Sequence, residues 1–300
     1  MPTRTDDDYQ MQVLGLVTSI DFGTVNGAAN ERGNGNDRIR AGSGRDMIFG
    51  GGGADDIHAW ADGGTAATDG NNIVFGDHGL VDYKAEELLA GNDATRNPPR
   101  TEDIDRIWSI AAATALGGDD VIVTGDRNDI VIGGAGSDTI DSGRGNPVTR
   151  IGVDLVLGDN ALLTGDKQDR SDGRFSVHEF TICRIETIGF EDADGGSDVV
   201  RGSDLNDVIF GGNGDDTIYA GAGDDLVFGD HGVVECKNGQ PYDPEISLRP
   251  ICWDDFPDVG FLMFEATNHT RSTGSGNDLV FGMDGSDVVM GQQGRDVLYG

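Results

Sequence analysis

The 300-residue chain lacks the sequence features of several large protein classes. It has no apolar stretch long enough to cross a membrane as a helix, and residues 1–20 lack the basic and apolar regions of a signal peptide. Export, if it occurs, is therefore not announced by such a peptide. Three cysteines are too few for a disulfide scaffold. Cys236 and Cys252 share one segment and could pair, which would leave Cys183 free.

Basic residues are also scarce. There are 21 Lys and Arg against 54 Asp and Glu, which gives a formal net charge of −33. The absence of basic patches argues against nucleic acid as a partner. An acidic excess of this size by itself pushes a compact state apart.

Catalytic motifs are missing as well. His178-Glu179 is followed by Phe180, so the zinc-protease pattern H-E-x-x-H fails, and no G-x-S-x-G nucleophile elbow occurs. Carboxylate pairs such as Asp119-Asp120 are frequent, but they fall inside a short repeat. We therefore expect no enzyme activity within this chain.

Glycine, by contrast, is abundant, and it recurs in a nine-residue pattern. The 49 glycines are about twice an ordinary globular content. The pattern is G-G-x-G-x-D-x-U-x with U a large aliphatic residue, and its first position varies. Fifteen such units begin at Arg32, Ala41, Gly50, Ala67, Ala115, Thr124, Gly133, Thr149, Ala193, Gly202, Gly211, Ala220, Thr273, Gly282 and Gly291. A register this regular predicts a repeat fold.

Each part of the unit has a physical reading. The G-x-G stretch suits a tight turn with φ > 0, where carbonyl oxygens face an ion. The Asp at the sixth position supplies a hard anionic oxygen, which suits calcium better than softer metals. The x-U-x tripeptide predicts a short strand whose single inward side chain fills a narrow core. Two units then make one coil with a strand on each side, and consecutive units alternate between the two faces.

This pattern resembles the RTX family of secreted calcium-binding β-roll proteins. The resemblance implies an all-β fold, a parallel β-roll (β-solenoid) with calcium ions between loops two units apart, and type I secretion. The sixth-position residues are then the metal ligands: Asp37, Asp46, Asp55, Asn72, Asp120, Asp129, Asp138, Asp154, Asp198, Asp207, Asp216, Asp225, Asp278, Asp287 and Asp296. The calcium-loop glycines are Gly33, Gly35, Gly42, Gly44, Gly51, Gly53, Gly134, Gly136, Gly212, Gly214, Gly221, Gly223, Gly274, Gly276, Gly285 and Gly294.

The units fall into four blocks, which start about 80 residues apart. The organisation is an N-terminal strand or hairpin segment (1–31), repeat blocks at 32–79, 115–161, 193–232 and an incomplete one at 273–300, and insertions at 80–114, 162–192 and 233–272. Each insertion ends in an apolar strand-like segment, such as 106–110. We read the insertions as β-hairpins or small β-meanders that project from the roll, with a short helix at 84–90 as an alternative.

The first three blocks close with one signature. It reads G-D-H-G at 76–79 and 229–232 and G-D-N-A at 158–161. Asp77, Asp159 and Asp230 in these closures are expected to be either additional metal ligands or turn residues. His78 and His231 could suggest a transition metal, but Asn160 stands at the equivalent place, so a turn role fits all three better.

The outward positions beside U differ between the two faces. In blocks one to three, even-numbered units present only apolar side chains: Met47, Phe49, Ile73, Phe75, Ile130, Ile132, Leu155, Leu157, Val208, Phe210, Leu226 and Phe228. Odd-numbered units present a mixed set. Exposed aromatics in a row are an aggregation hazard, so something must cover the even face. We favour the insertions folding back over it to form a second core; the alternative is lateral packing against another protomer.

These observations predict a calcium-binding structural module of a secreted or cell-surface protein: an adhesin, surface layer or filament component. The alternative is the C-terminal RTX portion of a secreted hydrolase or epimerase whose catalytic domain lies elsewhere. Calcium is the expected cofactor, with several ions bound. The expected partners are further copies of the repeat or of the chain itself, including a homopolymer, because the last block is expected to end on an open strand edge.

Overall fold

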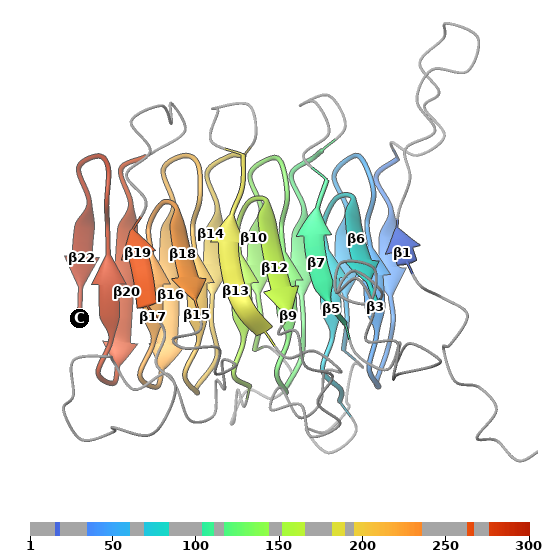
Figure 1. The fold of residues 1–300 in the computed structure, drawn as a ribbon, viewed down its shortest axis with the longest axis horizontal. Helices are drawn as coiled ribbons and strands as arrows, with labels where there is room; N and C mark the ends of the chain where they lie inside the picture. The colour runs from blue at the N-terminus through green and yellow to red at the C-terminus, as the bar shows by residue number, and fades with distance from the viewer. Residues whose placement is uncertain are drawn as a thin grey trace, which may run out of the picture.

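The computed structural model describes residues 16–18, 35–60, 69–83, 104–110, 117–143, 152–165, 182–189, 195–235, 263–266 and 276–300. All regular secondary structure in these segments is β-strand, arranged in three sheets (Figure 1). The all-β prediction is therefore confirmed. The expected short helix at 84–90 and the pairing of Cys236 with Cys252 lie outside the described residues.

The odd-numbered units form one parallel sheet of eight strands, here called the odd sheet. Its order follows the chain, and each strand is an x-U-x tripeptide or begins with one. The strands are β2 (Arg38–Arg40), β4 (Asp56–His58), β8 (Val121–Val123), β10 (Thr139–Asp141), β14 (Val199–Arg201), β16 (Thr217–Ala222), β20 (Leu279–Asp284) and β22 (Val297–Tyr299).

The even-numbered units form a second parallel sheet of seven strands, the even sheet. Its strands are β3 (Met47–Phe49), β5 (Ile73–Phe75), β9 (Ile130–Ile132), β11 (Leu155–Leu157), β15 (Val208–Phe210), β17 (Leu226–Phe228) and β21 (Val288–Met290). All fifteen predicted tripeptides are thus strands, and consecutive units alternate between sheets as the two-units-per-coil reading predicts. In each sheet the U residues pair directly, for example Ile122 with Ile140.

The core between the two parallel sheets is a double file of U side chains. Ile57, Ile122, Val131 and Ile140 are fully buried there, and the same holds for the equivalent residues of the third block. Fully burying one such side chain contributes about 1.5–3 kcal/mol relative to leaving it exposed. Leu298 in β22 differs, because 46% of its surface is exposed.

A third sheet lies against the outer face of the even sheet (Figure 1). It has seven antiparallel strands, and three of its neighbouring pairs each bracket one insertion. The strands are β1 (Leu16–Thr18), β6 (Gly79–Asp82), β7 (Arg106–Ser109), β12 (Ala161–Gly165), β13 (Ile182–Thr187), β18 (Gly232–Glu235) and β19 (Met263–Ala266). The predicted hairpins therefore exist, but their strands do not project from the roll. They join edge to edge into one continuous layer.

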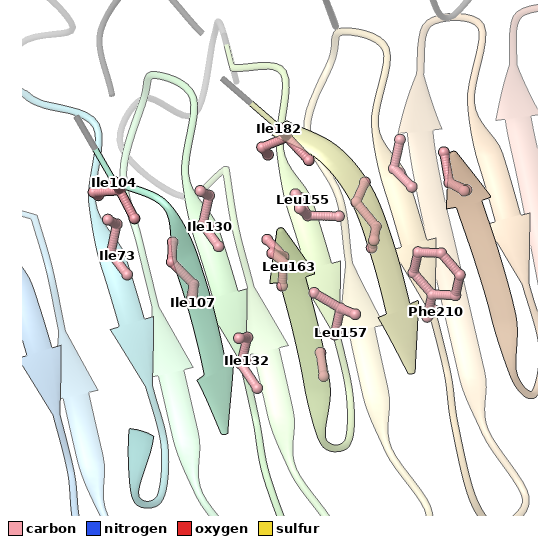
Figure 2. Close-up of a cluster of buried hydrophobic side chains, with 14 of the residues drawn as sticks. Ile73, Ile104, Ile107, Ile130, Ile132, Leu155, Leu157, Leu163, Ile182 and Phe210 are labelled. Carbon is pink, nitrogen blue, oxygen red and sulfur yellow. The ribbon is translucent and has the colours of Figure 1, made fainter. Parts of the chain in front are cut away.

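The second core lies between this antiparallel sheet and the even sheet. Ile130, Leu155 and Phe210 of the even sheet meet Ile107 and Leu163 of the antiparallel sheet, and Figure 2 shows these side chains converging from both layers. Two aromatic stacks, Phe49 on Phe75 and Phe210 on Phe228, extend the contact along the sheet. The expectation that the insertions cover the apolar even face is confirmed. Leucine, isoleucine and phenylalanine stand on this face because it is an interior surface.

The outer face of the odd sheet has no such layer among the described strands, and its character changes along the roll. Near the N-terminus Asp56 forms ion pairs with Arg38 and Arg40, with nitrogen–oxygen distances of 3.1 and 2.9 Å. Toward the C-terminus the rings of Tyr219, Phe281 and Tyr299 stack at 5.1 and 4.9 Å. This matches the mixed composition that the sequence gives the odd-numbered units.

Candidate metal centres

The loops that join the two parallel sheets form the two edges of the roll. The loops that lead into the odd sheet form one row, which we call the odd edge. The loops that lead into the even sheet form the other row, the even edge. The sixth-position residues form a column along each edge. The odd edge carries Asp37, Asp55, Asp120, Asp138, Asp198, Asp216, Asp278 and Asp296, and the even edge carries Asp46, Asn72, Asp129, Asp154, Asp207, Asp225 and Asp287.

One side-chain oxygen of each residue ties neighbouring coils together. Oδ1 of Asp138 accepts a hydrogen bond from the backbone N–H of Asp120 at 2.8 Å, and Oδ1 of Asp198 accepts one from Asp138 at 2.7 Å. The same bond links every consecutive pair in both columns, at 2.7–3.1 Å. All fifteen predicted metal-ligating residues are therefore brought into two continuous ladders.

The other carboxylate oxygen is left without a hydrogen-bond donor in most loops. This buried, unsatisfied Oδ2 occurs in Asp46, Asp55, Asp120, Asp129, Asp138, Asp198, Asp216, Asp225 and Asp278. A buried acceptor without a donor costs about 1–3 kcal/mol, and more when it is charged. That cost repeats along two columns, and either a cation or a proton at these oxygens would relieve it.

The pKa values of these carboxyl groups are shifted in the same sense. Burial, together with the neighbouring Asp138 carboxylate, raises the pKa of Asp120 to about 9. Burial and the nearby Asp207 likewise raise the pKa of Asp225 to about 9, and burial raises the pKa of Asp278 to about 7. The ionised form is disfavoured because burial removes it from water and neighbouring carboxylates repel it. A bound divalent cation would supply a compensating positive charge.

The glycines shape the loops around these oxygens. Twelve of the predicted calcium-loop glycines have a positive φ, for example Gly134 at 118° and Gly136 at 126°. A Cβ added at Gly136 would run into the backbone carbonyl of Gly118 in the preceding odd-edge loop. The loops therefore expose carbonyl oxygens next to the carboxylates, and a donor set made of hard oxygens suits calcium. Gly33 and Gly274 lie outside the described residues.

Three odd-edge loops are assembled from two distant pieces of chain. In an uninterrupted loop, the first glycine lies against the Oδ2 of its own sixth-position aspartate, as Gly133 lies against Asp138. The same contact forms between Gly76 and Asp120, across the first insertion. It recurs between Gly158 and Asp198 and between Gly229 and Asp278. Each insertion therefore leaves from and returns to a single candidate metal loop.

The aspartates of the closing signatures bridge these split loops to their neighbours. Asp230 accepts hydrogen bonds from the backbone N–H of Gly276 at 3.0 Å and of Gln293 at 2.7 Å. Asp159 accepts one from Gly196 at 3.1 Å and a second from Asn213. Asp77 accepts one from Ala135 at 2.6 Å. Of the two expected roles, these contacts favour the turn role for Asp159 and Asp230. Both roles stay open for Asp77, because its Oδ1 is buried without a hydrogen-bond partner.

The histidines of the closing signatures fit the same picture. His78 and His231 are buried, and Nε2 of His231 lies 3.0 Å from Oδ1 of Asn213. In the parts of the chain that the structure describes, no three His, Cys, Asp or Glu side chains gather into a group that could hold a metal ion. The candidate sites therefore depend on backbone carbonyls as much as on side chains.

Two even-edge positions depart from the rule. Asp207 Oδ2 accepts a hydrogen bond from the backbone N–H of Ser203 at 2.7 Å, so this carboxylate is satisfied within its own loop. Asn72 carries an amide in place of a carboxylate and donates to the carbonyls of Ala59 and Gly70, both at 3.0 Å. The sequence marks Asn72 as an exception, but Ser203 gives no comparable signal because its role depends on contacts across the loop.

Comparison with known families identifies the repeat. The family model of the RTX calcium-binding nonapeptide repeat matches four segments, residues 32–65, 114–148, 192–232 and 272–300. Each matched segment begins within one residue of the start of a block, and the first two end before the last unit of their blocks. RTX repeats of this kind bind several calcium ions, so calcium is the cofactor of these loops. Comparison with curated proteins finds no match. None of the described residues forms a helix that is long and apolar enough to span a membrane.

Proposed function

We propose that the chain is a calcium-dependent structural module of a secreted or cell-surface protein of the adhesin, surface-layer or filament kind. The observation that carries the proposal is the double column of buried Asp Oδ2 atoms without donors, as in Asp138 and Asp198. RTX repeats are typical of secreted proteins, and calcium at extracellular concentration matches the weak sites of extracellular modules, with Kd of about 10⁻⁴–10⁻³ M.

When bound, calcium supplies the positive charge that these columns lack. The chain's own residues position the oxygens. From the second coil onward, Oδ1 of the column residue accepts a backbone N–H of the preceding coil, the loop glycines form the turns, and most Oδ2 atoms are left without a donor. Ion binding to the folded state alone shifts the folding equilibrium toward the roll. Calcium thereby acts as a folding ligand.

The architecture supports a structural role rather than a catalytic one. The repeat aspartates form hydrogen bonds between coils. The large apolar residues of the even sheet and of the antiparallel sheet are buried in the second core. We propose that the chain has no catalytic activity of its own and that its described surfaces serve as a rigid, elongated spacer. Two continuous parallel sheets and a third antiparallel layer make a stiff three-layer rod.

Localisation on native cells tests the proposal. An antibody against the folded chain is used on intact cells, with and without a calcium chelator, and on cell lysate as the control. We expect labelling of the outer surface or the medium in calcium and loss of the conformational epitope in chelator. Labelling confined to the lysate, with an epitope insensitive to chelator, would contradict both parts of the proposal.

A further inference from the structure

The two edges of the roll differ in how their loops satisfy buried oxygens. On the odd edge every interior column residue, from Asp55 to Asp278, has an Oδ2 that is buried and lacks a donor. Each described odd-edge loop also has glycine at its fourth position, as at Gly136 and Gly214. Each interior loop of the odd edge therefore presents one buried Oδ2 without a hydrogen-bond donor.

On the even edge, the loop that ends at Asn72 supplies its own donors. The Nδ2 group of Asn72 donates to the carbonyl of Gly70, the fourth residue of its loop, and to that of Ala59. Asn72 is fully buried, and its Oδ1 still accepts the backbone N–H of Asp46 at 3.0 Å. The amide therefore keeps the hydrogen bond between coils through its Oδ1. Its Nδ2 group takes the place of the charged Oδ2 of an aspartate and binds the two carbonyls that would otherwise face a cation.

In the loop that ends at Asp207, a serine supplies the hydrogen-bond donors. Ser203 donates its backbone N–H to Asp207 Oδ2 at 2.7 Å and its hydroxyl to the carbonyl of Gly152 at 2.7 Å. Gly152 is the fourth residue of the preceding even-edge loop, so in both cases a donor binds a fourth-residue carbonyl, within one loop for Asn72 and between two loops for Ser203. Leu205 stands at the fourth position of its own loop without a positive φ, and its N–H donates to the Ser203 hydroxyl at 3.2 Å.

We propose that these two even-edge loops hold themselves by hydrogen bonds and take no calcium, so that the calcium column is continuous on the odd edge and interrupted on the even edge. The inference rests on the proposed calcium-dependent folding. The reason is local. Neutral N–H and O–H groups already donate hydrogen bonds to the oxygens that a cation would need, and a cation would have to break those hydrogen bonds to bind. Asn72 and Ser203 are therefore internal replacements for metal ions.

Restoring the consensus at one loop is the first test. Asn72→Asp supplies the missing carboxylate, and Asn206→Asp is the matched control, because it makes the same charge change at a fifth position where Asp215 and Asp224 already stand. We expect native mass spectrometry of the calcium-saturated protein to count about one more ion for N72D than for wild type, and no more for N206D. An unchanged count for N72D, with folding verified by circular dichroism, would overturn the inference.

Removing one carboxylate charge from each edge is the second test. Asp216→Asn and Asp207→Asn both keep an oxygen for the inter-coil bond, so both variants retain the ladder. We expect D216N to lose at least one bound ion and D207N to lose none. Equal losses in the two variants would overturn the inference while leaving calcium-dependent folding intact. A wild-type chain that binds no calcium would overturn the proposed function itself, so the two failures are distinguishable.

Discussion

The sixth-position aspartate uses its two oxygens for different purposes. In Asp138, Oδ1 accepts the backbone N–H of Asp120, and Oδ2 is buried without a donor. The first contact fixes the carboxylate in place, and the second oxygen is thereby held in position for a cation. Hydrogen bonding and metal binding are thus combined in one side chain. Loss of the metal removes the countercharge and leaves the buried Oδ2 without a partner.

The raised pKa values predict how acid acts on the calcium-free chain. Asp120, Asp225 and Asp278 have folded-state pKa values of about 9, 9 and 7, above the ordinary 3.8. Folded chains therefore bind more protons than unfolded ones. The corresponding stability is fully present below pH 3.8 and is lost as the pH rises through about 7 to 9. Acidification should favour the metal-free roll.

Circular dichroism of the calcium-free protein tests whether acidification stabilises the fold. Lowering the pH from 8 to 5 should increase the β signal, since across this window the folded chain binds more protons at these carboxyl groups than the unfolded chain does. In saturating calcium the same change should instead release ions and lower the unfolding temperature, because the ligands must be ionised to bind. A β signal of the calcium-free chain that falls on acidification would contradict the burial of these groups.

At the scale of the elements, the second core makes the roll more than a stack of repeats. Phe210 is fully buried between the even sheet and the antiparallel sheet, whereas Tyr219, one unit later, stands half-buried on the odd face. Replacing a buried phenylalanine by alanine typically costs about 3–5 kcal/mol. The two aromatic residues therefore provide a matched pair for testing which face of the roll is interior.

Chemical unfolding in saturating calcium measures the difference. Phe210→Ala should lower the free energy of unfolding by about 3–5 kcal/mol, and Tyr219→Ala by less, because a partly exposed side chain loses fewer contacts. Equal losses for the two variants would mean that the antiparallel sheet does not pack on the even face as described.

The split loops couple an insertion to a metal site. Asp198 completes the loop that begins at Gly158, where the chain leaves for the second insertion, whereas Asp216 completes an uninterrupted loop. Asp198→Ala should weaken hydrogen-exchange protection in β12 and β13 as well as in the neighbouring loops. Asp216→Ala should affect the loops but spare β12 and β13, since solenoid units contact mainly their neighbours.

The range of these effects is a further check. Both variants should leave β3 and β5 of the first block protected. Uniform loss of protection from the first block to the last would show that cooperativity runs through the whole array. It would contradict the local account of the sites.

Most of this architecture could be predicted from the sequence, because a period of nine fixes both the strand and the loop. The strand around Ile140 and the ladder position of Asp138 follow directly from it. The cover over Phe210 could be inferred only as a requirement, since an exposed aromatic row is unfavourable. That the hairpin strands would join into one sheet depends on contacts between insertions about 80 residues apart, and the repeat does not encode those.

The candidate sites could likewise be predicted only in part. The column residues follow from register, but the roles of Asp159 and Ser203 do not. The Asp159 carboxylate reaches amides at Gly196 and Asn213, on two successive odd-edge loops. Ser203 reaches Gly152 across the even edge. Such bonds depend on which loops the coil brings together, and a composition of Asp, Ser and Gly is compatible with several patterns.

At the scale of the whole molecule, we expect calcium to change both charge and association. Each bound ion removes two negative charges, so about ten ions would bring the formal charge from −33 to about −13. β22 is an edge strand of the odd sheet, and the side chains of Val297 and Tyr299 are 47% and 53% exposed. Once repulsion falls, such an apolar edge can pair with another strand.

Light scattering after size-exclusion chromatography tests this association. We expect the mass per particle to increase with calcium at high protein concentration, and Val297→Lys to reduce the increase by placing a charge on the edge strand. The equivalent position in β2 already holds Arg38, so lysine is compatible with this strand position. Compact monomers at millimolar calcium, for wild type and variant alike, would contradict self-association.

The central claim is that calcium supplies the charge that this fold lacks, and far-UV circular dichroism against calcium concentration tests it most directly. At pH 7.5 in chelator, the chain should give the spectrum of a largely unfolded polypeptide. A cooperative gain of β signal should follow near millimolar calcium, and magnesium should have little effect because it prefers strict octahedral sites. A chain that is equally folded in chelator and in calcium would contradict the account.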